Sequence, residues 1–170
     1  MNVSNCAQGD IDTIFYLYRS AVAYQRAKGY NLWPEFDRIM VENEISEKRI
    51  FKITEGNDTA CVFTIAYTDP NIWQEKDKEP SVYLHRIATN PSFKGRGIVH
   101  LVKKWAADHA RRQNKKYLRL DTWGNNENLA KYYQQCGFTF VGQKHLTKEE
   151  AANMPAHYCG LTLSLFEIIL

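Results

Sequence analysis

The 170-residue sequence contains no apolar run of the ~20 residues that a helix needs to cross a bilayer. Its first residues also lack the basic stretch followed by an apolar one that marks a secretory signal peptide. These absences argue against a spanning segment and against export. We therefore expect a soluble, cytoplasmic protein with no membrane partner.

Cysteine and histidine spacing excludes the common metal-site motifs. The four cysteines form no C-x-x-C pair, which argues against a zinc knuckle or a disulfide framework. They are Cys6, Cys61, Cys136 and Cys159. The five histidines form no H-E-x-x-H motif, and no G-x-S-x-G nucleophile motif is present. We expect reduced thiols and no bound metal.

Charge and composition narrow the remaining classes. The net charge is only +3 and the basic residues are dispersed, so we expect no nucleic-acid partner. Hydrophobic residues make up 44% and charged residues 24% of the chain, which is typical of a globular protein. No repeat or Pro/Gly/Ser-rich linker divides the sequence. We expect a single domain over residues 1–170.

Apolar spacing predicts two helices near the N-terminus. The first starts after Asp10, an N-cap residue, and ends at Gly29. Its apolar residues recur at helical spacing: Ile11, Ile14, Phe15, Tyr18 and Val22. The second and shorter helix is predicted over residues 33–44, with Pro34 in its first turn.

The rest of the chain mixes strands with helices. Strands are predicted over 49–54, 61–68, 81–89, 117–123, 138–142 and 158–165, and the polar stretch 69–80 is predicted to be a long loop. A helix is predicted after residues 95–97 and another over 126–136. This order favours a mixed sheet covered by helices over a helical bundle or a β-sandwich.

The segment NPSFKGRGI, residues 90–98, links a predicted strand to an amphipathic helix. Gly95 and Gly97 let the backbone approach a ligand, and the start of the helix adds partial positive charge. Lys94 and Arg96 bring full charges to the same turn. The turn is therefore a candidate phosphate site, although a plain strand-to-helix turn stays open. Its spacing fits neither a Walker loop nor a dinucleotide fingerprint.

A second constellation lies in the segment 125–138. Asn126 and Tyr133 are seven positions apart, which places them on one helix face about 10 Å apart along the axis. Asn126 can cap the helix or donate to an amide-bearing ligand, and Tyr133 can face a groove or pack in the core. We expect Cys136 to be a small buried residue and Gly137 to end the helix.

Together these two segments resemble the GNAT superfamily of N-acetyltransferases. The family's coenzyme A signature, Arg/Gln-x-x-Gly-x-Gly/Ala, aligns with residues 94–99. Lys94 stands where Arg or Gln is usual, and Val99 where a small residue is usual. The resemblance implies an α/β (α+β) fold: a mixed, mostly antiparallel sheet of about six to seven strands with splayed central strands, flanked by about four helices.

The resemblance also implies acetyl-coenzyme A as the co-substrate. The fourth strand of the family pairs its backbone with the pantetheine arm, and the glycine turn binds the pyrophosphate. The residues that match these segments are Ile87, Ala88, Thr89, Lys94, Gly95, Arg96, Gly97, Ile98, Val99, Asn126 and Tyr133.

The implied chemistry is direct acetyl transfer to an amine in a ternary complex. A backbone N–H within 87–89 would stabilise the oxyanion, and Tyr133 matches the family's general acid. The base stays open between Glu79 and His85, with Asp121 a weaker option. Equally, His85 can simply pack in the interior and Glu79 can be a solvated charge.

The acceptor is expected to be a small-molecule or peptide amine. Aromatic residues of the first two helices and of the loop 69–80 are candidates to bind it by cation–π contact, or are ordinary core: Tyr24, Tyr30, Trp33 and Trp73. Two alternatives stay open, a non-catalytic acyl-coenzyme A sensor and a transferase of a longer acyl group. A homodimer stays open as well.

Overall fold

The computed structural model describes residues 1–152, 154 and 158–170. The chain forms two compact units, which we call unit 1 (Met1–Ile65 and His85–Trp105) and unit 2 (Ala66–Leu84 and Ala106–Leu170). Strand β4 (Ser81–Thr89) and helix α4 (Ile98–Arg112) each contribute residues to both units. The single domain over 1–170 stays a prediction.

Seven strands within the described residues follow the order β1-β2-β3-β4-β5-β7-β6. Besides β4, they are β1 (Asn2–Asn5), β2 (Ile50–Glu55), β3 (Asp58–Ala66), β5 (Tyr117–Trp123), β6 (Thr139–His145) and β7 (Thr162–Ile169). The β4–β5 pair is parallel, whereas β1–β2, β2–β3, β5–β7 and β6–β7 are antiparallel. The predicted mixed, mostly antiparallel sheet is confirmed.

The described helices are α1 (Ile11–Ala27), α2 (Arg38–Ser46), α3 (Pro70–Trp73), α4 and α5 (Glu127–Gln135). Three short 3-10 turns accompany them: η1 (Gln8–Asp10), η2 (Gln74–Lys78) and η3 (Pro91–Phe93). No helix among the described residues has the length and apolar character that crossing a membrane requires.

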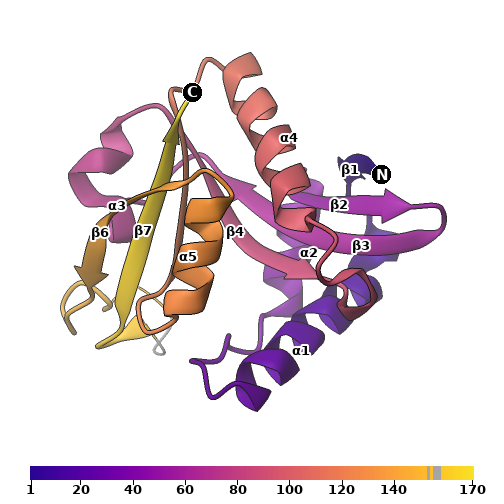
Figure 1. The fold of residues 1–170 in the computed structure, drawn as a ribbon, viewed down its shortest axis with the longest axis horizontal. Helices are drawn as coiled ribbons and strands as arrows, with labels where there is room; N and C mark the ends of the chain where they lie inside the picture. The colour runs from indigo at the N-terminus through magenta and orange to yellow at the C-terminus, as the bar shows by residue number, and fades with distance from the viewer. Residues whose placement is uncertain (153, 155–157) are drawn as a thin grey trace. The chain divides into compact units, whose positions relative to one another are not determined.

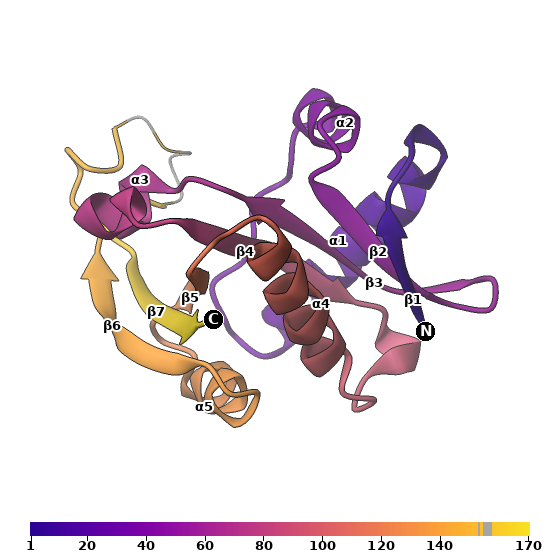
Figure 2. The same cartoon turned by 90° about the horizontal axis from the view of Figure 1, so that it is seen from above.

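Unit 1 has helices on both faces of its strands (Figure 2). One face carries a cluster to which α1, α2, β2, β3 and β4 all contribute, with Ile14, Val41, Ile50, Val62 and Ala88 among its members. On the other face the Trp105 ring of α4 lies 4.2 Å from the Phe51 ring and 5.3 Å from the Phe63 ring, between ring centroids.

Unit 2 places α3 and α5 on opposite faces of its strands (Figures 1 and 2). Strands β5 and β7 pair Arg119 with Glu167 and Leu120 with Phe166. Because successive strand residues point to opposite faces, these two pairs lie on different faces. The Tyr133 ring of α5 packs on Phe166 at 5.8 Å, and the Trp73 ring of α3 lies 4.8 Å from the Arg119 guanidinium.

Before β4, two predicted elements differ most from the structure, while β2 and β3 are shifted by one to three residues from the predicted 49–54 and 61–68. Helix α2 begins at Arg38 rather than near residue 33, because the Asp37 side chain accepts a hydrogen bond from the Met40 N–H and caps the helix there. The predicted loop 69–80 contains α3 and η2. Its Ile72 and Trp73 are buried, and their burial orders a segment that is polar in composition.

The ends of the chain also differ from prediction. The four-residue strand β1 was not predicted, because such a short run carries too little alternation to be recognised. Strand β7 begins at Thr162 rather than at residue 158, and its pairing with β5 covers Leu163 to Ile169. The predicted boundaries of β4 and β5, in contrast, are confirmed.

All four cysteines are free thiols, as predicted. Cys6, Cys61 and Cys136 are buried, and Cys159 is exposed. Burial raises the pKa of the Cys6 and Cys61 thiols to about 12, so both stay protonated at neutral pH.

Candidate functional site

In unit 1 the chain leaves β4 through a tightly held Asn90. Its N–H donates to the Ala60 carbonyl at 2.8 Å, and its side-chain amide donates to the Thr59 carbonyl at 3.0 Å. Its side-chain oxygen accepts a hydrogen bond from the Ser92 N–H at 3.0 Å. The start of the glycine turn is therefore fixed to β3.

The turn itself leaves open space beside its backbone. Gly95 and Gly97 have φ angles of 80° and 68°, in a backbone region that residues with a Cβ rarely adopt. A Cβ at Gly95 would meet nothing within 4 Å, and one at Gly97 would meet only the His100 ring at 3.9 Å. Open backbone at the start of α4, where the helix dipole is positive, is an arrangement that binds phosphate.

The first helical turn of α4 is anchored by apolar side chains. Ile98 and Val99 are 3% and 9% exposed and belong to the buried core. The branched side chain of Val99 is therefore packed inside rather than standing over the turn.

Both cations of the turn have partners within unit 1. The Lys94 ammonium lies 4.3 Å from the centroid of the Tyr24 ring of α1. The Arg96 guanidinium binds the Glu55 carboxylate at 2.8 Å and lies 4.8 Å from the Phe93 ring centroid. Tyr24, expected from the sequence to contact the acceptor, is in contact with the turn.

Strand β4 contains a backbone irregularity at Arg86, whose φ is +50°. For a residue other than glycine this conformation costs roughly 1–3 kcal/mol and persists only where its surroundings hold it. The Arg86 guanidinium binds the buried Glu44 carboxylate and the Thr64 hydroxyl, and it lies 5.2 Å from the Phe36 ring centroid. These contacts keep Arg86 in its unfavourable backbone conformation.

The residues on either side of Arg86 are His85, one of the two main candidates for the base, and the segment 87–89, the candidate contact of the cofactor. Burial, with the charges of Arg86 and Arg49 adding to it, lowers the pKa of His85 to about 4, so its imidazole is neutral at pH 7. Ala88 is buried in the core, whereas the side chains of Ile87 and Thr89 are half-buried.

The remaining acceptor candidates fall into two groups. In unit 1, Tyr30 and Trp33 are half-buried, and the Trp33 ring packs edge-on against Tyr18 and Phe36 at 6.0 and 5.9 Å. In unit 2, Trp73 is only 3% exposed, and its ring packs against the Arg119 guanidinium. Trp73 is a core residue, the alternative left open by its sequence.

Glu79 is engaged by a buried arginine of unit 2. Arg119 is fully buried, and its guanidinium donates to the Lys76 carbonyl at 2.6 Å, the Ser81 hydroxyl at 2.9 Å and the Glu167 carboxylate at 3.1 Å. It also binds the Glu79 carboxylate, and this hydrogen bond lowers the pKa of Glu79. A carboxylate held in this way is a poor proton acceptor.

Helix α5 presents Asn126 and Tyr133 as buried residues. The Asn126 side chain accepts a hydrogen bond from the Leu129 N–H at 3.0 Å, which confirms its capping role. Tyr133 is 9% exposed, and its ring lies 5.9 Å from Phe138. Cys136 is buried, as predicted.

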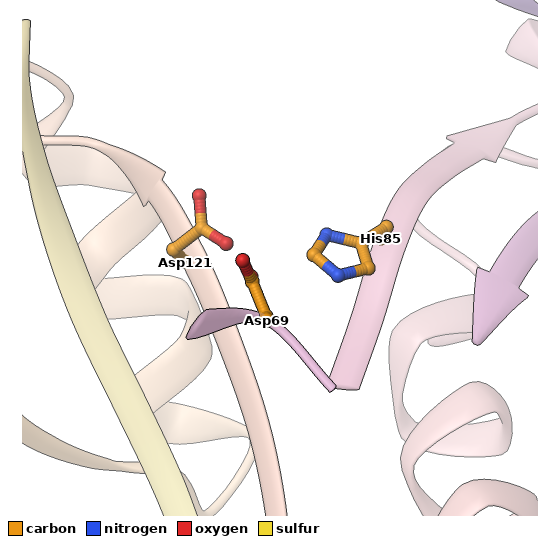
Figure 3. A group of neighbouring side chains, drawn as sticks. All are labelled: Asp69, His85 and Asp121. Carbon is orange, nitrogen blue, oxygen red and sulfur yellow. The ribbon is translucent and has the colours of Figure 1, made fainter. Parts of the chain in front are cut away.

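Unit 2 also brings two carboxyl groups together. Figure 3 shows Asp69 and Asp121 turned toward each other, and their oxygens lie within 4.8 Å; the figure also draws His85, which belongs to unit 1. Burial raises the pKa of Asp69 to about 8, with the Asp121 charge contributing, and burial raises that of Asp121 to about 7. Carboxylate pairs are also common ligands of Ca²⁺, but two carboxylates offer at most about four oxygens, whereas this ion takes about six to eight.

Because both carboxyl groups have raised pKa values, we expect the stability of the folded protein to fall as pH rises. The folded-state pKa of Asp69 is about 8 against an ordinary 3.8, so between these values the folded state binds more protons. The free energy of unfolding therefore decreases as pH rises through this window. Asp69→Asn should raise the melting temperature at pH 9 by roughly 2–4 °C, the shift that about 1 kcal/mol produces in a chain of this size.

Differential scanning calorimetry at pH 5 and pH 9 checks this, with exposed Asp58→Asn as the control. The gain of Asp69→Asn should shrink at pH 5, where the native carboxyl is protonated as well. A gain of the same size at both pH values, or none at either, would show that the pair does not carry a pH-dependent cost.

Sequence reasoning missed three side chains that the structure makes prominent: Asp69, Arg86 and Arg119. Arg119 had a usable signal, because it is a charged residue between two apolar ones, Leu118 and Leu120, in a predicted strand. All three residues are buried in the structure. Asp69 and Arg86 had none, since Asp121 and Glu44, the residues that give them their prominence, lie far away in the sequence.

Comparison with known proteins gives a consistent assignment. The model of the Acetyltransferase (GNAT) family matches residues 21–138. The uncharacterized N-acetyltransferase YesJ of Bacillus subtilis (strain 168) is 26% identical in an alignment of 141 residues that covers 78% of this chain and 78% of its own.

Two solved structures share the fold. A GNAT-family acetyltransferase of Listeria monocytogenes 4b F2365 aligns with a TM-score of 0.79 at 23% identity, covering 99% of this chain and 94% of its own. The structure of yncA from Salmonella typhimurium with its cofactor acetyl-CoA aligns with a TM-score of 0.71 at 14% identity, covering 100% and 94%. Because the family model spans more than half of the sequence, the chain belongs to the GNAT acetyltransferase family and is an acyltransferase.

Proposed function

We propose that this enzyme transfers an acetyl group from acetyl-coenzyme A directly to a primary amine of a small molecule or peptide. The observation that carries the proposal is the turn between β4 and α4. Its two left-handed glycines leave open backbone at a helix start, beside Lys94 and Arg96. The acetyl-CoA complex of yncA, which has the same fold, supports this choice of cofactor.

The proposed cofactor contacts divide between backbone and side chains. Backbone N–H groups of Gly95, Gly97, Ile98 and Val99 bind the pyrophosphate, with the side chains of Lys94 and Arg96 adding charge. The backbone of Ile87, Ala88 and Thr89 pairs with the pantetheine arm. Burial of the Ala88 side chain in the α1 and α2 cluster fixes the position of this stretch.

The reaction moves two protons. The neutral amine attacks the thioester carbonyl, a backbone N–H near the Arg86 irregularity stabilises the resulting oxyanion, and the attached nitrogen loses one proton. The C–S bond then breaks, and Tyr133 donates its phenolic proton to the departing thiolate. His85 is the proposed first acceptor for the amine proton, because it lies on β4 directly before the Arg86 irregularity and its imidazole is neutral at pH 7, although its lowered pKa makes it a weak base.

Of the four aromatic candidates for binding the acceptor amine, two residues of unit 1 are left. The Tyr24 ring already lies under Lys94 and the Trp73 ring under Arg119, so neither ring face is open to a second cation on that side. Tyr30 and Trp33 remain as the proposed aromatic contacts of the amine, on the connection between α1 and α2.

The test combines calorimetry with acetyl-coenzyme A and an assay of free thiol release over a panel of amines. Wild type should bind and release thiol. Gly97→Asp, which places a carboxylate beside the phosphates at a φ that aspartate adopts more readily than most other residues with a Cβ, should bind at least about tenfold more weakly. His85→Ala should bind normally and turn over about 10²-fold more slowly.

Other outcomes decide between the alternatives. Binding without thiol release from any amine would favour the acyl-coenzyme A sensor. Faster release from longer acyl thioesters would favour a different acyl donor. Unchanged affinity in Gly97→Asp, with its melting temperature intact, would remove the turn from the cofactor site.

A further inference from the structure

The two cations of the glycine turn are held by partners of different chemistry. Lys94 lies 4.3 Å from the centroid of the Tyr24 ring, which is a neutral partner. Arg96 binds the Glu55 carboxylate at 2.8 Å, which is a charged partner. Tyr24 belongs to α1 and Glu55 is the last residue of β2, so both partners come from outside the turn.

This difference decides how much positive charge the turn offers to an anion. Contact with a ring orients an ammonium and leaves its full charge in place. Contact with a carboxylate cancels most of the field of a guanidinium at a distance. Lys94 therefore offers its charge to an incoming phosphate, whereas the charge of Arg96 is held by Glu55.

Each contact also changes how far the side chain of Lys94 or Arg96 must move when a ligand binds. Lysine on an exposed turn samples many rotamers, and the Tyr24 ring restricts them in advance. The Arg96–Glu55 pair is 46% and 43% exposed at its two side chains, so water and salt weaken it. Arg96 can therefore leave Glu55 for a phosphate, with which it forms the stronger bidentate pair.

We propose that Tyr24 is a positioning residue that holds Lys94 at the phosphate turn. We also propose that the Glu55 carboxylate competes with the phosphate of coenzyme A for Arg96, so that this ion pair must break when the ligand binds. This inference rests on the proposed binding of coenzyme A at this turn. It goes beyond the glycine signature, because it assigns control of coenzyme A affinity to two residues outside that signature.

The experiment is a calorimetric titration of coenzyme A, which needs no acceptor and no turnover. Tyr24→Leu should raise the dissociation constant by about two- to fivefold, because the ring contact is lost. Tyr24→Phe keeps the ring and should retain the wild-type value. Glu55→Gln should lower the dissociation constant by about two- to fivefold, and more at low salt than at high salt.

Contacts with the 3′-phosphate are separated from contacts with the pyrophosphate by repeating the Glu55→Gln titration with dephospho-coenzyme A, which lacks the 3′-phosphate and keeps the pyrophosphate. The gain should persist; its disappearance would overturn the assignment to the pyrophosphate. The two substituted side chains, Tyr24 and Glu55, are exposed, and equal melting temperatures confirm that each of the three variants folds.

Equal effects of Tyr24→Leu and Tyr24→Phe would overturn the positioning role of the ring. A dissociation constant that is unchanged or raised in Glu55→Gln would overturn the competitor role. Wild-type protein that binds no coenzyme A would overturn the proposed function and this inference together. Wild-type binding with unresponsive variants would overturn only the inference.

Discussion

Tyr133→Phe is expected to lower the turnover number for acetyl transfer by about 10²- to 10⁴-fold while leaving the dissociation constant of acetyl-coenzyme A unchanged. The phenolic hydroxyl is the proposed proton donor to the departing thiolate. The ring packs against Phe138 and Phe166 in a site that is only 9% exposed. Phenylalanine keeps that packing, so the loss should fall on chemistry.

Steady-state kinetics and calorimetry on the same protein samples separate the two effects. Tyr132→Phe is the matched control, because Tyr132 is the neighbouring residue of the same helix and is only half-buried. It should keep its turnover number. A Tyr133→Phe enzyme with wild-type turnover would remove Tyr133 from the mechanism, and equal losses in both variants would point to a disturbed helix.

Arg119→Met is expected to destabilise the protein by about 3–5 kcal/mol, because removing one side of a buried ion pair leaves the other side uncompensated. Glu167, with a side chain only 14% exposed, would lose its guanidinium partner. The Ser81 hydroxyl and the Lys76 carbonyl would lose a donor as well. Methionine still fills much of the space beside the Trp73 and Tyr117 rings.

Thermal unfolding measures this change, with an expected fall in melting temperature of roughly 6–20 °C at 2–4 °C per kcal/mol. Arg111→Met is the control, because Arg111 pairs with Asp108 on the surface at exposures of 55% and 50%. Its stability should change by no more than about 0.5 kcal/mol. Similar losses in the two variants would contradict the structural role of Arg119.

The elements that sequence predicted best are those with strong local patterns. Strands β4 and β5 were predicted to the residue, because their apolar runs end at Asn90-Pro91 and at Gly124. The start of α2 was missed by five residues. Pro34 is a common first-turn residue, yet Asp37 is the residue that caps the helix in the structure.

The candidate site divides in the same way. The glycine turn and the α5 segment are contiguous in sequence, so the residues of each could be recognised together. The Asp69–Asp121 pair and the Arg119 network join residues 52 and up to 48 positions apart, and no local pattern reports such contacts. Glu79 could be found as a carboxylate near β4, but its pairing with Arg119 could not, because the two residues are 40 positions apart.

The burial of three thiols has a practical consequence for enzymology and for labelling. Cys6, Cys61 and Cys136 are shielded, while Cys159 is exposed, so a thiol-specific reagent meets one accessible sulfur on the folded chain. Assays that count liberated coenzyme A with such a reagent therefore carry a background of one equivalent per enzyme molecule. The same sulfur is a ready attachment point for a single fluorophore or spin label.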